Sequence, residues 1–154
     1  MATMDNNDVV DTLNGLIETS RDGENGFRQC AEHVQGEDLR MLMTQRADEC
    51  ARAVEELAVL VRNYGGTPED TGSATGAMHR GWVAVKDALS GRDNQALLDE
   101  CERGEDAAKS AYRDALEQPL PSDAQQVVSR QFQGVLRNHD QIKALRNARM
   151  GKSS

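Results

Sequence analysis

Residues 37–66 read EDLRMLMTQRADECARAVEELAVLVRNYGG, and this stretch decides the fold class. Apolar side chains recur along it at steps of three and four residues, which is the period of one helical face. They are Leu39, Leu42, Met43, Cys50, Val54, Leu57, Leu60, Val61 and Tyr64. Gly65 and Gly66 end the pattern, because glycine is the usual residue just past a helix C-terminus. The pattern predicts an amphipathic helix over 37–64.

The same period continues on both sides of this segment. Residues 7–34 carry one apolar stripe before it, and residues 93–118 and 123–149 carry similar stripes after it. Prolines within 119–121 separate the last two. Each of the four predicted helices is about 40 Å long at 1.5 Å per residue. Matched lengths of this kind predict a four-helix bundle.

The connections predict how the helices run. The turns at 35–36 and 119–121 are short, so each joins two antiparallel helices. Residues 65–92 are numerous enough to return along the bundle, which makes the second and third helices parallel. A bundle with one long crossover is the ferritin-like arrangement. Within the crossover, the spacing predicts a short extra helix over 74–89. We therefore expect an all-α, ferritin-like four-helix bundle.

Composition excludes several classes of protein. The formal net charge is -8, with 18 Lys+Arg against 26 Asp+Glu, which argues against nucleic-acid binding because basic groups supply most of that affinity. No apolar run reaches the ~18–20 residues of a membrane span, and only five residues are aromatic, which argues against a sheet protein. We expect one cytoplasmic domain over 7–149, with flexible tails at 1–6 and 150–154 and neither nucleic acid nor membrane as a partner.

The cysteines do not indicate a disulfide framework. Cys30, Cys50 and Cys101 are an odd number without a CxxC motif, and each falls on an apolar helical face. This pattern favours reduced thiols in the core over a disulfide or zinc site.

Polar residues interrupt the apolar stripes near the middle of the predicted helices. With about 100° of rotation per residue, the inward and border positions are Ser20, Glu24, Arg46, Glu49, Glu102, Glu105, Gln131, Asn138, His139 and Arg146. A buried carboxylate is costly unless it is paired or bound to a metal. The inward carboxylates among these residues therefore require a positive counter-charge in the interior.

Two arrangements would supply such a counter-charge. In one, a single iron, manganese or zinc ion is held by the inward carboxylates and the histidine, namely Glu24, Glu49, Glu102, Glu105 and His139. In the other, Arg46 bridges Glu24 and Glu105, His139 bonds to Glu102, and Gln131 joins the polar network. We favour the network, because a fixed guanidinium repels a second cation.

Several motifs resemble one bacterial family. They are the segments 22–27 (DGENGF), 65–68 (GGTP), 79–82 (HRGW), 100–106 (ECERGED) and 139–143 (HDQIK). Together they are similar to the DUF2383 family of four-helix-bundle proteins, which is placed in the ferritin-like superfamily. The resemblance extends over about 8–147 and implies a ferritin-like fold. It brings no established activity.

The wider ferritin and rubrerythrin pattern is only partly present. Ser20 stands where the first-helix glutamate of that pattern is expected, seven residues before an aromatic. Glu49 is followed by Arg52, and Leu136 precedes His139, so both expected E-x-x-H motifs are broken. A two-metal oxidase site is not expected from these residues.

The leading hypothesis is a non-enzymatic bundle with a stress or regulatory role, in which the network replaces a degenerate metal site. One alternative is a non-haem metal-binding protein, and another is a structural protein–protein interaction module. We expect a homo-oligomer, such as a dimer, or a helical protein partner. His79, Arg80 and Trp82 form a candidate surface site on the crossover.

Overall fold

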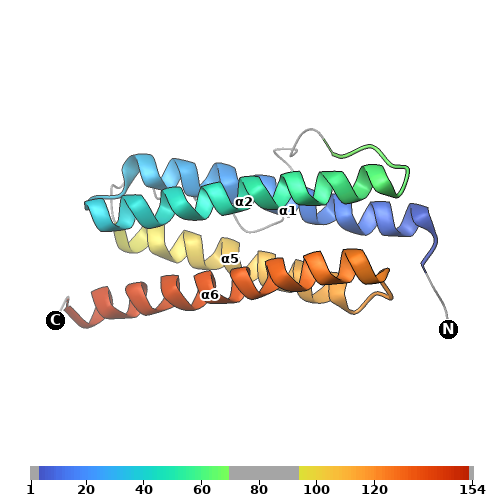
Figure 1. Ribbon diagram of the computed structural model, residues 1–154. Coiled ribbons are helices and arrows are strands. Elements are labelled where there is room, and N and C mark those ends of the chain that lie inside the picture. Colours follow the sequence, from blue (N-terminus) through green and yellow to red (C-terminus); the bar gives the residue numbers. More distant parts are fainter. Residues whose placement is uncertain (1–3, 70–93, 153–154) are drawn as a thin grey trace.

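A computed structural model describes residues 4–69 and 94–152, and these form four helices with no strand (Figure 1). The helices are α1 (Asn6–His33), α2 (Glu37–Asn63), α5 (Asn94–Leu116) and α6 (Ser122–Lys152). Each begins and ends within three residues of the bounds expected from the sequence. The prediction of an all-α, ferritin-like bundle is confirmed.

The helix directions also agree with the sequence prediction. In Figure 1, α1 and α2 are antiparallel, α5 and α6 are antiparallel, and α2 and α5 run the same way. The second and third long helices are therefore parallel, as a single long crossover requires. The short helix expected over 74–89 lies outside the described residues. The same is true of the candidate surface site formed by His79, Arg80 and Trp82.

The helix termini follow from local chemistry. Asp5 caps α1 by accepting a hydrogen bond of 2.8 Å from the Asp8 backbone N–H. Gly36 precedes α2 with φ 109°, and Gly65 follows it with φ 82°. Both values lie in the left-handed region, which glycine adopts without steric cost. These two glycines therefore fix where α2 begins and ends.

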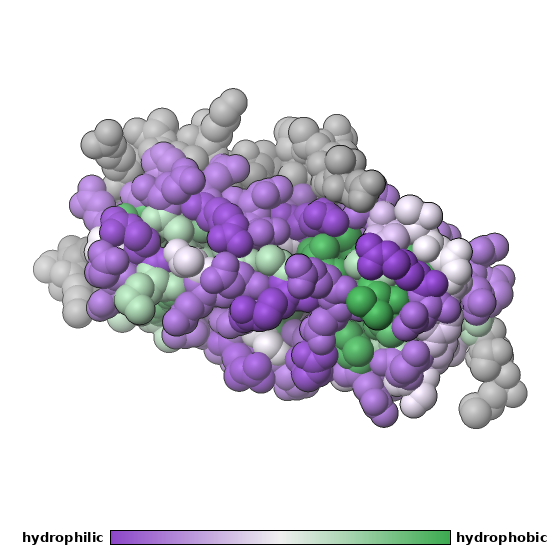
Figure 2. All heavy atoms as spheres, turned by 45° about the horizontal axis from the view of Figure 1, so that its top comes forward, coloured by the Kyte–Doolittle hydropathy of each residue, from purple (hydrophilic) through white to green (hydrophobic). Residues whose placement is uncertain are grey.

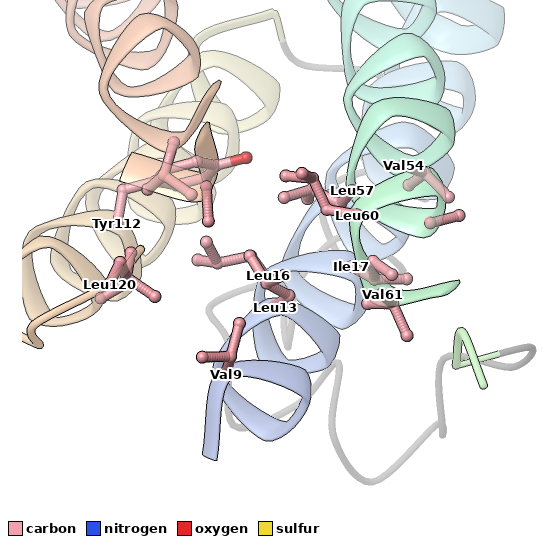
Figure 3. Close-up of a cluster of buried hydrophobic side chains, with 14 of the residues drawn as sticks. Val9, Leu13, Leu16, Ile17, Val54, Leu57, Leu60, Val61, Tyr112 and Leu120 are labelled. Atoms are coloured by element: carbon pink, nitrogen blue, oxygen red, sulfur yellow. The ribbon is translucent and has the colours of Figure 1, made fainter. Parts of the chain in front are cut away.

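The apolar core consists of two clusters, one toward each end of the bundle. The first surrounds Leu13 and Leu57 near the start of α1, and Figure 3 shows side chains from opposite helices meeting there. The second surrounds Phe27 and Met43 and includes Cys30, Cys50 and Cys101. All three cysteines are free and buried, as the sequence predicted. Buried polar side chains lie between the two clusters.

The helices pack against one another unequally. α1 packs most extensively on α2, whereas α2 and α6 have the least extensive contact of the packed pairs among the described residues. The outer surface in Figure 2 is mainly hydrophilic, with some hydrophobic side chains near the end where α1 begins. Within 4–69 and 94–152, no helix is both long and apolar enough to cross a membrane.

Candidate polar site in the middle of the bundle

The centre of the site is an ion pair between Arg46 on α2 and Glu105 on α5. Both are buried, with 7% and 1% of their surface exposed. Arg46 Nε donates to Glu105 Oε1 at 2.7 Å, and Nη2 donates to Oε2 at 3.4 Å. This two-point contact suits the planar guanidinium. The Arg46 head also lies 5.7 Å from the centre of the Phe27 ring, within the range of a cation–π contact.

A second carboxylate reaches the same guanidinium. Arg46 Nη1 donates to Glu49 Oε2 at 3.3 Å, one turn further along α2. Asn138 on α6 donates to the same oxygen at 2.8 Å. Three helices thus share one charged network, in which a single guanidinium contacts two carboxylates.

The electrostatics of the network follow from its burial. Burial opposes the charge of Arg46, but the adjacent carboxylates of Glu105 and Glu49 keep its pKa above the ordinary value. Burial also raises the pKa of Glu105, and Arg46 limits that rise. Burial raises the pKa of Cys50 to about 12, so this residue is a neutral thiol at physiological pH.

Glu24 is not part of this network, and its predicted bridge to Arg46 is wrong. It pairs with Arg28 on its own helix, with Arg28 Nη2 3.0 Å from Glu24 Oε2. Arg28 also pairs with Asp48 on α2 at 3.2 Å. A cation one turn away on the same helix reaches Glu24 without crossing the bundle. Glu49 is the second carboxylate of Arg46 instead.

His139 is buried, but its predicted bond to Glu102 is also wrong. Its Nε2 lies 2.5 Å from Asp106 Oδ1, and Glu102 forms an ion pair with Arg146. Even so, Glu102, Asp106 and His139 each offer a ligand atom within 4.8 Å of the others. Sequence reasoning missed Asp106, although its spacing of four residues from Glu102 places both on one face of α5.

Gln131 belongs to a separate chain of hydrogen bonds. Tyr112 donates to Gln131 Oε1 at 2.8 Å, and the Tyr112 hydroxyl lies 3.3 Å from Ser20 Oγ. Gln131 Nε2 donates to Glu56 Oε1 at 3.2 Å. The prediction that Gln131 joins the Arg46 network is therefore wrong. Tyr112 was missed as a polar group because its ring falls on the apolar stripe.

Two further buried carboxylates were not foreseen from helical spacing. Asp22 and Glu100 are each 4% exposed. Glu100 pairs with Arg103 on the same helix at 2.6 Å. The apolar stripe of a helix does not identify a carboxylate at the edge of that stripe, because its burial depends on which neighbouring helix of the same chain covers it.

A cavity of about 320 Å³ lies beside these groups. All four helices contribute to its wall, from Thr19, Ser20 and Gly23 on α1 to Gln131, Gly134 and Arg137 on α6. It is adjacent to both the Arg46 network and the Tyr112–Gln131 pair. The contact between α2 and α6 is the least extensive of the packed pairs among the described residues, which leaves room for this cavity.

A metal ion does not fit the Arg46 network. Glu105 and Glu49 are the carboxylates that would bind it, and Arg46 already contacts both. A cation bound there would have to displace a buried guanidinium or lie beside it. The Glu102, Asp106 and His139 group does fit one ion in its donor types, because carboxylate and imidazole suit iron, manganese and zinc.

Comparison with known proteins agrees with this architecture. The family model described as a domain of unknown function, DUF2383, matches residues 8–118. The chain belongs to the DUF2383 family. The motifs of 22–27, 65–68, 79–82 and 100–106 fall inside the matched range, whereas the motif of 139–143 lies beyond it. No curated protein matches the chain.

Two solved structures are similar to this DUF2383 protein in fold. One is a mutant of Mycobacterium smegmatis Dps1, with TM-score 0.74 and 17% identity over 90% of this chain and 95% of that one. The other is a dodecameric thioferritin, the bacterioferritin-related protein of Bacteroides fragilis, with TM-score 0.77 and 15% identity over 98% and 92%. At these identities the similarity shows a common ferritin-like fold.

Proposed function

We propose that this protein is a non-enzymatic ferritin-like bundle with a stress or regulatory role, in which Arg46 stands in place of a metal ion. One observation carries the proposal: the buried, two-point contact between Arg46 and Glu105. A guanidinium stays charged at physiological pH and supplies no redox chemistry. The site then stabilises the middle of the bundle and is not a centre for oxidation.

The test is the metal content of protein purified without chelator. We expect no stoichiometric metal that depends on Glu105. Stoichiometric iron, manganese or zinc that is lost in Glu105→Ala would overturn the proposal.

A variant that removes the guanidinium sharpens this test. Arg46→Met leaves Glu49 and Glu105 without their cation, and we expect it to bind added Mn²⁺ or Zn²⁺ more tightly at mid-bundle than the natural protein does. Arg40→Met is the matched control, since Arg40 pairs with Glu37 on the surface of the same helix at 3.0 Å. Weaker metal binding in Arg46→Met than in the natural protein would contradict the idea that Arg46 excludes a cation.

A second candidate function is the binding of a single iron, manganese or zinc ion by Glu102, Asp106 and His139. The observation in its favour is the convergence of three ligand atoms within 4.8 Å. Arg146 competes for Glu102, so the ion would have to displace this arginine. Calorimetric titration with Zn²⁺ and Mn²⁺ tests it, and His139→Ala should abolish binding. His33→Ala, at an exposed histidine of α1, should leave binding unchanged.

We also propose that the protein is cytoplasmic and forms a homo-oligomer, of which a dimer is the simplest. The observation that supports assembly is the fold, since the similar thioferritin is dodecameric. Light scattering tests the assembly, and a strict monomer at high concentration would count against it.

A further inference from the structure

The mid-bundle cavity has the size and lining of a small-molecule site. Its volume of about 320 Å³ lies within the range of ligand pockets, roughly 300–1,000 Å³. The wall includes Ala53, Ala108 and Val135, which are apolar, and the buried Tyr112 and Gln131, which are polar. Such a mixed wall can contact the apolar body of a ligand and orient a polar group.

Charged residues in the cavity wall favour an anion. The wall contains four arginines, Arg46, Arg52, Arg130 and Arg137, against three glutamates, Glu49, Glu56 and Glu105. This leaves one positive charge in a protein whose net charge is -8. The charge of the cavity wall and the net charge of the protein therefore have opposite signs. The excess of arginine in the wall does not follow from the overall composition of the chain.

Two of these arginines are available for a ligand. Arg46 pairs with Glu105 and Glu49, and Arg130 pairs with Glu56. Arg52 on α2 and Arg137 on α6 are exposed, and within 4–69 and 94–152 neither has a carboxylate partner. They therefore offer two cationic side chains on the helices that flank the loosest contact of the bundle.

Gly134 places the head of Arg137 at the cavity. A Cβ added to Gly134 would lie 3.6 Å from Arg137 Nη2, so the guanidinium lies close against its own helix. Gly134 and Arg137 both line the cavity. Arg137 therefore lies at the wall that Gly134 and the buried Tyr112 also form.

We propose that this cavity binds a small organic monocarboxylate. The carboxylate lies between Arg52 and Arg137, and the apolar body packs against Ala53, Ala108 and Val135. A single negative charge matches the one excess positive charge of the wall, whereas a doubly charged phosphate exceeds it. This inference goes beyond the proposed function, because it assigns a ligand to the space beside the Arg46 network.

Calorimetric titration of the full chain with sodium benzoate tests the proposal. Benzamide is a neutral ligand of nearly the same shape, and inorganic phosphate is an anion without an apolar body. We expect benzoate to bind with a dissociation constant of about 1 mM or below and benzamide to bind at least about tenfold more weakly, since it cannot form the charged hydrogen bonds. Phosphate should bind more weakly than benzoate.

Variants locate the site. Arg52→Gln and Arg137→Gln should each weaken benzoate binding by about tenfold, whereas Arg113→Gln, at an exposed arginine of α5 outside the cavity, should not change it. Ala108→Leu fills the cavity and should abolish binding while the circular dichroism spectrum stays helical. Should Ala108→Leu fail to fold, chemical shift changes of Ala53 and Val135 on adding benzoate locate the ligand in the natural protein.

Three outcomes would overturn the proposal: no saturable benzoate binding, equal binding of benzamide, or undiminished binding in the Arg52→Gln, Arg137→Gln double variant. Tighter binding of phosphate than of benzoate would overturn the assignment of a monocarboxylate. Metal analysis of the same samples keeps the two proposals separate, since a metal ion dependent on Glu105 contradicts the proposed function whether or not benzoate binds.

Discussion

Two clusters of polar residues on α5 solve the same electrostatic problem in different ways. Glu105 faces the interior and is 1% exposed, and its counter-charge is Arg46, a part of the chain. Asp106 is the next residue, but 59% of its side chain is exposed, and it meets the buried His139 at 2.5 Å. The central pair of the first cluster is buried and has its own cation, whereas the second brings ligand atoms together within reach of solvent.

This difference teaches how burial decides what a carboxylate needs. A buried carboxylate needs a counter-charge in the folded protein, and Arg46 supplies one for Glu105. An exposed carboxylate is solvated when no ion is present, so its cluster needs no fixed cation. The Arg46 network is therefore expected to affect stability, and the His139 cluster to respond to added metal.

The largest expected effect is at the closed cluster. Glu105→Ala leaves the buried guanidinium of Arg46 without its main partner and should lower the free energy of unfolding by about 3–5 kcal/mol. Chemical denaturation measures this loss. Glu37→Ala removes the exposed pair with Arg40 and should cost less than about 1 kcal/mol.

The double variant Arg46→Met, Glu105→Leu should recover most of that stability, because it removes both buried charges together. A loss in Glu105→Ala as small as that in Glu37→Ala would mean that burial of the Arg46–Glu105 pair adds nothing to its effect on stability, and would break the comparison.

The second effect concerns added metal. Zn²⁺ or Mn²⁺ at 100 times its dissociation constant should raise the free energy of unfolding by about 2.7 kcal/mol through binding to the folded state. Thermal unfolding with and without the ion measures the gain. Asp106→Asn should remove it, while Asp48→Asn, at an acid paired with Arg28 on the surface, should keep it. A gain that survives in Asp106→Asn would place the ion elsewhere.

A third effect tests the hydrogen bonds beside the cavity. Tyr112→Phe removes the hydroxyl that bonds to Gln131 and lies near Ser20, which should cost about 1–2 kcal/mol because buried polar atoms lose a partner. Tyr64→Phe is the control, since its hydroxyl bonds to the exposed Asp123. Equal losses in the two variants, measured by urea denaturation, would mean that burial of the Tyr112 hydroxyl has no special weight.

The smallest effect is a pH dependence at Glu56. Hydrogen bonds from Arg130, and secondarily from Gln131, lower the pKa of Glu56 in the folded protein. As the pH falls, Glu56 therefore takes up its proton at a higher pH in the unfolded state than in the folded state. The stabilisation from the charged carboxylate is present above the unfolded pKa of about 4.3 and is lost as the pH falls toward the lower folded pKa.

Because 38% of the Glu56 side chain is exposed, the effect should stay below about 1 kcal/mol. The difference in unfolding free energy between natural protein and Glu56→Gln should shrink between about pH 5 and pH 3. A difference that is constant across this range would contradict the role of the Arg130 pair.

Much of the architecture can be predicted from the sequence because helical period and chain breaks are local properties. The stripe ending at Gly65 gives α2 to within one residue, and the lengths of the two types of connection give the directions of the helices. Arg46 and Glu105 were also recognised as inward partners, because both lie on apolar faces. The role of either residue in metal binding stays a prediction.

Partners across the bundle were harder to predict. Glu24, His139 and Gln131 are inward or half-buried, as expected, but each contacts a residue other than the one predicted. One residue along a helix changes height by about 1.5 Å and direction by about 100°. Glu102 and Asp106 are four residues apart on α5, so they differ by about 6 Å in height but only about 40° in direction. An error of one helical turn in the register between helices therefore exchanges Glu102 for Asp106 as the partner of His139.

The sequence by itself determined a ferritin-like bundle with a belt of inward polar residues near its middle, because spacing within each helix sets which residues turn inward. Only the tertiary structure decided that Arg46 joins Glu105 and Glu49, and that a cavity with four arginines opens beside them. The reason is physical: side-chain partners depend on rotation and register between helices far apart in the chain, and neither is encoded in the period of any one helix.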